Sequence, residues 1–396
     1  MCPRPSALEP EVLGFEHQVH QVHTMAPLTE TIMERHTSTT TETTSMMAKP
    51  DQAMAPKKYK IEMVWWNVFK ISLIHLIGIY GIYEMYYSKW QTHVFGNIIL
   101  IFSGISVTAG AHRLWCHRAY KAKMPLRIFL MIFNCVAAQV GGQIIASIDS
   151  SYMMPVKNDL YEWVRDHRVH HKYSETDADP HNVNRGFFFA HVGWLMCRKH
   201  PEVTEKGKHI DCSDILADPV ARFQKKYYMR LVLLFSFILP TVIPGWLWGE
   251  SYWNAFCTAT MLRLILSLNF TWSVNSFAHL WGNKPFDKSI SPTEAPWVSF
   301  VAVGEGFHNF HHTFPWDYST SELGWKLNMS TMFIDIMAKL GQAYDLKTVS
   351  REAVLARKLR TGDGTRLPRR FRKMAAPERE NAAAAATAAV TGASQG

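Results

Sequence analysis

The 396-residue sequence lacks the features of a disulfide-stabilised protein and of a nucleic-acid-binding protein. Its six cysteines are scattered without paired spacing, and it begins with no short apolar stretch of the signal-peptide type, so we expect reduced, cytosol-facing thiols. The formal net charge is +9, yet no finger motif and no basic stripe with interleaved aromatic residues occurs. Nucleic acid therefore ranks last among the expected partners, and the basic surplus suits an anionic membrane face or an acidic protein.

Both ends of the chain are poor in large apolar side chains. Residues 1–56 are polar and rich in threonine, so they cannot bury enough apolar surface to fold. Residues 365–396 are first rich in arginine and then rich in alanine. We expect a disordered tail at each end and a folded domain over residues 57–364.

The central part of the chain is apolar, and hydrophobic residues make up 47 % of the whole sequence. Four runs approach the ~20 residues that a helix needs to cross the hydrocarbon core of a membrane, at about 64–88, 94–111, 229–249 and 252–274. Short links join the first two runs and the last two, which predicts two helical hairpins. Arg263 lies inside the fourth run, so its side chain should face the bundle interior and find a partner there. Core helices of a soluble protein are the alternative, which suits one such run but not four paired runs.

Basic residues predict which side of the membrane the polar segments occupy. They cluster before the first and third runs and after the second: Lys57, Lys58, Lys60, Arg113, Arg118, Lys121, Lys123, Arg127, Lys225, Lys226 and Arg230. The links inside the hairpins carry only Lys89 as a base. By the positive-inside rule, both ends of the chain and the segments 112–228 and 275–364 should be cytosolic. The predicted fold class is an all-α membrane protein, with four transmembrane helices in two hairpins and a cytosolic helical cap.

Nine of the nineteen histidines gather near the expected cytosolic ends of these hairpins. They form one H-x-x-x-x-H box, two H-x-x-H-H boxes and one single position: His112 and His117; His167, His170 and His171; His308, His311 and His312; and His279. In a helix, positions i, i+3 and i+4 share one face, so the histidines of an H-x-x-H-H box can point together. Asn275 and His279 share a face in the same way.

Nine imidazoles in one place indicate a site for two metal ions. A zinc site uses about four ligands, and neutral imidazole also binds iron and copper well. Two metals suit redox chemistry on an unreactive C–H bond, where dioxygen must be activated, and iron is the metal that suits this task. Coincidence could explain one box, but it explains three boxes at the ends of membrane hairpins poorly.

The boxes also resemble those of a known family. H-R-L-W-C-H at 112–117, H-R-V-H-H at 167–171 and H-N-F-H-H at 308–312 are similar to the boxes of membrane acyl-CoA desaturases of the stearoyl-CoA type. The flanking sequences at 177–182 and 275–279 match as well. The likeness is strongest to insect members, some of which make pheromone precursors.

The resemblance implies an oxidoreductase that turns a long-chain saturated fatty acyl-CoA, dioxygen and two electrons into a cis-unsaturated acyl-CoA, of Δ9 or Δ11 type, and water. It implies two iron ions held by the nine histidines, with Asn275 reaching a metal through water, and no catalytic residue beyond the metal centre. It further implies electrons from cytochrome b5 and its reductase. The expected location is the endoplasmic reticulum membrane, with both termini in the cytosol.

The resemblance implies substrate-binding residues too. Four match family positions that hold the CoA head group: Arg165, Asp166, Arg198 and Lys199. Three match positions that shape the bend of the acyl tunnel: Gln139, Trp163 and Thr271. Asn158 is expected to bind substrate as well. Arginine and lysine suit the CoA phosphates, although a solvated surface would show the same charges, and a tryptophan on an apolar face can be plain core.

One segment departs from the family pattern. In relatives, Ala-Gln runs directly into Asn-Asp-x-Tyr-Glu-Trp, whereas residues 140–157 here separate Gln139 from Asn158. This segment is either a natural variation that leaves the site intact or an in-frame unspliced segment that impairs the enzyme. Two alternatives to an active acyl-CoA desaturase therefore stay open: a His-box membrane hydroxylase or alkane oxygenase, and a catalytically impaired desaturase-like protein.

Overall fold

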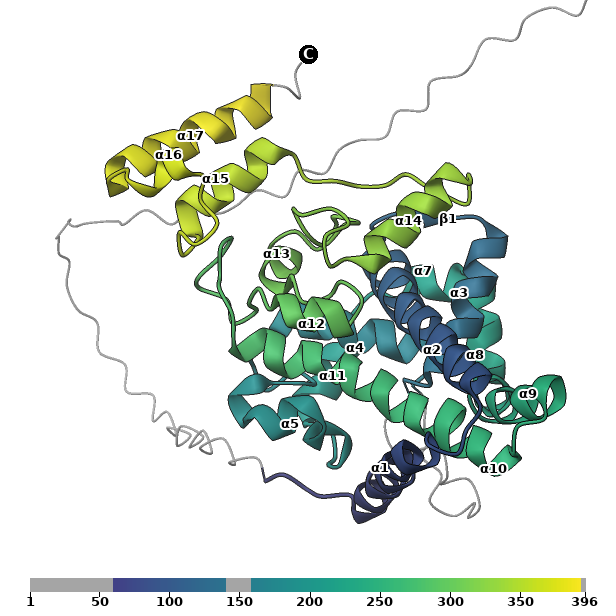
Figure 1. Ribbon diagram of the computed structural model, residues 1–396. Helices are drawn as coiled ribbons and strands as arrows, with labels where there is room; N and C mark the ends of the chain where they lie inside the picture. The colour runs from purple at the N-terminus through teal and green to yellow at the C-terminus, as the bar shows by residue number, and fades with distance from the viewer. Residues whose placement is uncertain (1–59, 140–157, 393–396) are drawn as a thin grey trace, which may run out of the picture. The chain divides into compact units, whose positions relative to one another are not determined.

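Helices dominate the computed structural model, which describes residues 60–139 and 158–392 (Figure 1). The expected N-terminal tail, 1–56, and the unusual segment 140–157 lie outside the described residues. All described residues belong to one compact unit.

In chain order the helices are α1 (Trp65–Glu84), α2 (Trp90–Ile105), the π-helix η1 (Ser106–Cys116), α3 (Met124–Ala137), α4 (Leu160–Tyr173), the 3-10 helix η2 (Val183–Arg185), α5 (Phe187–His191), the 3-10 helix η3 (Gly193–Leu195), α6 (Pro201–Lys208), α7 (Ser213–Ala217), α8 (Pro219–Val232), the π-helix η4 (Leu233–Ile238), α9 (Leu239–Trp248), α10 (Tyr252–Ala255), the π-helix η5 (Phe256–Leu262), α11 (Arg263–Leu280), α12 (Pro296–Val301), α13 (His308–Thr313), α14 (Met329–Lys339), α15 (Arg351–Thr361), α16 (Arg369–Arg372) and α17 (Ala376–Gly392). The two short strands are β1 (Lys121–Ala122) and β2 (Ala343–Tyr344).

Three helical runs in the described part are long and apolar enough to cross a membrane: Trp65–Glu84, Trp90–Cys116 and Pro219–Trp248. They coincide with the first three expected spans, and α1 and the α2–η1 run follow each other along the chain, with α1 packed mainly against η5. Expected span 252–274 lies in a continuous helix built from α10, η5 and α11, but this helix is not among the three. Polar side chains lower its mean hydropathy, among them Arg263, which is 2 % exposed. The predicted inward orientation of Arg263 is thus confirmed.

The links at the closed ends of the two expected hairpins contact each other. The backbone N–H of Lys89 donates to Glu250 Oε2 at 2.7 Å, and its ammonium group donates to the Trp248 carbonyl at 2.8 Å. The Thr92 hydroxyl donates to the same Glu250 oxygen at 2.6 Å. A carboxylate and three donors therefore join the two links.

The α2 helix continues into η1, whose eleven residues are all buried. A π-helix is wider than an α-helix, occurs mostly as short segments and is frequent at functional sites. Here its last turn closes through the His117 N–H, which donates to the His112 carbonyl at 3.0 Å. The first histidine box is therefore built into the backbone of the second candidate span.

Strand pairing and a continuous core attach the segments that follow η1. Lys121 pairs with Tyr344 and Ala122 with Ala343 in an antiparallel sheet. The main core cluster includes Leu130 of α3, Leu160 of α4 and Ile334 of α14. Elements that are far apart in the sequence thus pack around the base of η1.

The C-terminal region differs from the expected disordered tail over 365–396. The structure describes α16 and α17 there, and Phe371 and Ala383 pack with Leu359 and Leu367 in a small apolar cluster. Alanine has the highest helix propensity, so the alanine-rich stretch forms a helix once α15 offers it an apolar surface. The expectation is corrected for residues 369–392.

Candidate metal centre

Five histidines from three helical regions converge in a first group: His112, His117, His167, His171 and His311. The Nε2 atom of His311 lies 2.9 Å from that of His112 and 2.9 Å from that of His171. The Nε2 atoms of His167 and His171 are 3.1 Å apart. One ring nitrogen of each residue lies within 4.8 Å of those of the others, which is close enough for one shared ion.

Four further histidines form a second group: His170, His279, His308 and His312. The Nε2 atom of His308 lies 3.0 Å from that of His279 and 3.1 Å from that of His312. The rings of His171 and His312 stack with centroids 4.1 Å apart, so the two groups are direct neighbours.

Each H-x-x-H-H box divides its histidines between the two groups. His167 and His171 enter the first group and His170 the second, while His308 and His312 enter the second group and His311 the first. The sequence predicts that all three side chains of a box point together. In a helix, however, positions i and i+4 lie on one side of position i+3, so one box can serve two adjacent ions.

Three carboxylates from outside the boxes contact the ring nitrogens that face away from the groups. They approach the Nδ1 atoms at 2.9 Å in each case: Glu305 to His112, Glu175 to His279 and Asp179 to His170. A carboxylate at Nδ1 holds the proton there and leaves Nε2 with a free lone pair that points into the group. Sequence reasoning missed these carboxylates. The only signal for them in the sequence is that acidic residues at 175–179 and 305 lie close to two of the boxes.

Burial makes most of these rings poor bases. It lowers the pKa well below the usual 6.5, and neighbouring imidazoles lower it further, for six of them: His117, His167, His171, His308, His311 and His312. Burial also lowers the pKa of His279. For His170 burial acts in the same direction, but Asp179 outweighs it and the pKa is raised. Neutral rings are the form that binds metal ions.

The geometry of the donors fits two cations. Nitrogens bound at about 2.1 Å to one ion, and at right angles to each other, lie about 3 Å apart. The Nε2 separations of 2.9–3.1 Å in both groups match this spacing. The Nε2 atom of His117 is buried and has no hydrogen-bond partner in the described part of the chain, as expected of a lone pair that faces an ion.

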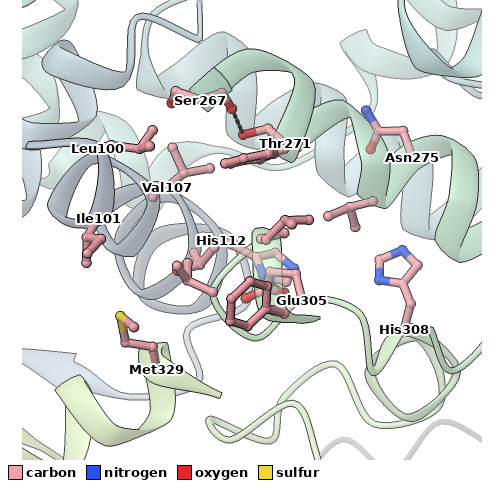
Figure 2. Close-up of a pocket in the computed structure, with 18 of the residues that line it drawn as sticks. Leu100, Ile101, Val107, His112, Ser267, Thr271, Asn275, Glu305, His308 and Met329 are labelled. Atoms are coloured by element: carbon pink, nitrogen blue, oxygen red, sulfur yellow. Dashed lines mark hydrogen bonds and ion pairs between the residues drawn. The ribbon is translucent and has the colours of Figure 1, made fainter. Parts of the chain in front are cut away.

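A cavity of about 330 Å³ extends from the two histidine groups into the helical bundle (Figure 2). Leu100, Ile101 and Val107 of α2 and η1 form an apolar wall away from His308, and Phe270 and Val274 of α11 also line the cavity (Figure 2). His112, Glu305 and His308 lie at the other end, together with Asn275 of α11 (Figure 2). An apolar chain that fills this space would therefore lie beside the candidate metal ions.

Comparison with known proteins agrees with this arrangement, since the family model for fatty acid desaturases matches residues 88–324. The chain belongs to the fatty acid desaturase family. It is 52 % identical over 307 residues to stearoyl-CoA desaturase 5 of Bos taurus, covering 78 % of this chain and 86 % of that protein. It is 53 % identical over 305 residues to stearoyl-CoA desaturase of Homo sapiens, covering 77 % and 80 %. It is 52 % identical over 309 residues to the acyl-CoA Delta12-desaturase of Acheta domesticus, covering 78 % and 82 %. The resemblance inferred from the histidine boxes is confirmed.

The desaturase brings together the three residues expected at the bend of the acyl tunnel and Asn158, which was expected to bind substrate. Trp163 and Thr271 line the large cavity, and both also line a smaller one of about 50 Å³ with Gln139 and Asn158. The Gln139 amide donates to the Thr271 hydroxyl at 3.1 Å, and the Asn158 amide donates to the Gln139 carbonyl. The residues on either side of the segment 140–157 are thus in contact.

Three of the four residues expected at the CoA head group form one cluster in this desaturase. Asp166 pairs with Arg165 at 2.8 Å and with Lys199. Burial alone would raise the pKa of Asp166, but Lys199 and Arg165 lower it. Arg198 instead pairs with Glu62 at 3.2 Å, on an exposed surface.

Proposed function

We propose that this desaturase introduces a cis double bond, of Δ9 or Δ11 type, into a long-chain saturated fatty acyl-CoA. The observation that carries the proposal is the apolar cavity that ends at two adjacent groups of histidines. The relatives support the substrate class, because stearoyl-CoA desaturases and an acyl-CoA desaturase are among them. Dioxygen is the proposed oxidant, with electrons from cytochrome b5 and its reductase.

We assign the two groups of histidines to two iron ions, with the five nitrogens of the first group around one ion and the four of the second around the other. Asn275, at the same end of the cavity as His308, is assigned to the second ion through a water molecule (Figure 2). Bound iron would supply the dioxygen-dependent redox chemistry that an unactivated C–H bond requires. The chain itself holds the neutral imidazoles in place through Glu305, Glu175 and Asp179.

The remaining task of the chain is to position the substrate. The apolar wall excludes water and holds the acyl chain, and the contact between Gln139 and Thr271 shapes the region around Trp163. Which methylene pair lies beside the histidines decides where the double bond forms, because reaction rates fall steeply when the reacting atoms are misplaced. Arg165, Asp166 and Lys199 form the proposed binding site of the CoA head group, with Arg198 beside them.

The proposed topology has four spans in two hairpins, in the endoplasmic reticulum membrane, with both termini cytosolic. The ties from Lys89 to Glu250 and Trp248 support it, because they put both hairpin links at one end. Only Lys89 is basic in these links, whereas the opposite ends are rich in Lys and Arg. The proposed desaturase domain is 57–364.

Expression in a yeast strain that lacks its own desaturase tests the function. We expect a fatty acid two hydrogens lighter than its precursor, with the double bond located by mass spectrometry of a derivative. His171→Ala should abolish the product and leave membrane insertion unchanged. The exposed His209 provides the matched control, and His209→Ala should retain activity. Gain of an oxygen atom would identify a hydroxylase, and bound iron without product would identify an impaired desaturase-like protein.

A further inference from the structure

Arg263 is a buried cation that the histidine groups and the acyl cavity leave unexplained. Its partners in the described part of the chain are carbonyl and hydroxyl oxygens. Nη1 donates to the Val136 carbonyl at 2.6 Å, and Nη2 donates to the Ser236 carbonyl at 2.8 Å and the Ser236 hydroxyl at 3.2 Å. The Ser236 hydroxyl donates to the same Val136 oxygen at 2.9 Å. Because a charge inside a membrane bundle is costly, such a residue marks a functional requirement.

Val136 lies in the last turn of α3, where carbonyl groups have no partner within the helix. The next residue but one, Ala138, has a φ of 41° and ends the helix in the left-handed conformation. A cation suits this position, since the carboxyl-terminal end of a helix carries a partial negative charge. Arg263 of α11 therefore ties the end of α3 to the π-helix η4 through Ser236.

Gln139 directly follows Ala138, the residue that ends α3. Its amide reaches the Thr271 hydroxyl on α11, so α11 holds the end of α3 at two points. The Thr271 hydroxyl in turn donates to the Ser267 carbonyl at 3.0 Å (Figure 2). If the α3 end moved, Gln139 could not stay within hydrogen-bond distance of Thr271 beside Trp163.

We propose that Arg263 is a positioning residue for desaturation: it fixes the end of α3, and thereby the contact between Gln139 and Thr271 that shapes the acyl cavity. This inference rests on the proposed function. Arg263 would act through Gln139 on the position of the acyl chain, and so on which carbon atoms react. A residue that only stabilises the bundle would change the amount of active enzyme but not the ratio of its products.

The test compares product ratios in the desaturase-deficient yeast. Arg263→Met removes all donors, Arg263→Lys keeps the charge but cannot bridge both carbonyls, and Gln139→Ala removes the downstream contact. Arg230→Met, at an exposed position on α8, is the matched control. Double-bond positions are determined by mass spectrometry, and iron per protein is measured on the purified variants.

For Arg263→Met we expect turnover per iron-loaded protein to fall on the order of 10²-fold, the cost of a misplacement of about 1 Å. The ratio of positional isomers should shift severalfold, in the direction that Gln139→Ala also gives. Arg263→Lys should shift it less, and Arg230→Met should leave it unchanged. The double variant Arg263→Met/Gln139→Ala should be no worse than the worse single variant, because both changes break one chain of contacts.

Unchanged isomer ratios in the arginine variants would overturn the proposal, as would losses that multiply in the double variant. If Arg263→Met does not accumulate in membranes, the isomer ratio of Arg263→Lys provides the test, and an unchanged ratio would overturn the proposal. Absence of any unsaturated product from the unaltered protein would refute the proposed function instead, so the two failures are distinguishable.

Discussion

Glu305→Gln should weaken metal binding without changing any ring of the two histidine groups. Glu305 is buried, and its two oxygens serve different partners: Oε2 lies 2.9 Å from His112 Nδ1, and Oε1 accepts from Arg113 at 2.8 and 3.1 Å. Burial alone would raise the pKa of Glu305, but His112 and Arg113 lower it to about 2, so the carboxylate is ionised at neutral pH. An amide has one acceptor oxygen, so its NH₂ group must face either the His112 N–H or the Arg113 guanidinium, which are both donors.

The magnitude follows from these two contacts. Loss of a carboxylate that orients a metal-binding histidine typically costs 10–100-fold in metal affinity, or about 1.4–2.7 kcal/mol. Breaking a buried ion pair costs roughly 3–5 kcal/mol of folding stability. We expect a loss of folding stability at the lower end of this range. Arg113 keeps two other hydrogen bonds, to the Thr331 hydroxyl at 2.9 Å and to the Tyr318 carbonyl at 3.0 Å.

The assay measures iron per protein by mass spectrometry during titration with a competing chelator, and the melting temperature of the purified protein. Glu202→Gln is the matched control, since Glu202 makes an exposed pair with Lys206 at 3.9 Å that is worth about 1 kcal/mol at most. If Glu305→Gln bound iron as tightly as the unaltered protein, Glu305 would have no role in orienting His112. Equal losses of iron affinity and melting temperature in Glu305→Gln and Glu202→Gln would show that the assay responds to non-specific destabilisation, and not to the loss of a contact with His112.

Three further predictions concern the metal, the unusual segment and pH. Chelation of iron should lower the melting temperature of the unaltered protein more than that of His171→Ala, because bound ions stabilise the folded state and this variant lacks a ligand of the first group; an equal response of both proteins would contradict this. Deletion of residues 140–157 should preserve or raise desaturation, since Asn158 already contacts Gln139, and a complete loss of product would count against it. Burial alone would raise the pKa of Asp214, but Arg168 and Arg118 lower it from 3.8 to about 2. The ionised carboxylate therefore stabilises the fold above about pH 4, and this stabilisation is lost as the pH falls towards 2. Asp214→Asn should therefore reduce the difference between the melting temperatures at pH 6 and pH 3, and an undiminished difference would refute the assignment.

The sequence predicts the local features of the site well, because they depend on helical spacing and hydropathy. The boxes at 112–117, 167–171 and 308–312 lie in or directly after helices, and their eight histidines meet together with His279. The division of each H-x-x-H-H box between two groups was not predictable, since it depends on how α4 and α13 lie relative to each other and to the other histidines. Likewise, Glu175 and His279 are 104 positions apart, and no local pattern links them.

Two other differences have similar causes. The helix over the fourth expected span, 252–274, is not among the three that are long and apolar enough to cross a membrane, because polar residues such as the buried Arg263 lower its mean hydropathy. Composition overestimates disorder after residue 365, because the arginine-rich stretch hides Leu367 and Phe371, which pack against α15 and α17. In both places the decisive contacts come from segments that are distant along the chain or from a neighbouring helix.

The distance in sequence between His112 and His311 also has a consequence for biogenesis. Their ring nitrogens are 2.9 Å apart, yet 199 positions separate them, and α13 follows all the candidate spans. On the proposed topology, the hairpins would enter the lipid during synthesis before either group of histidines is complete. Ions would then be captured by a chain that is already inserted, and a chain cut short before residue 308 would insert with both groups incomplete. On this proposal, the place of α13 in the order of translation would set the timing of metal capture.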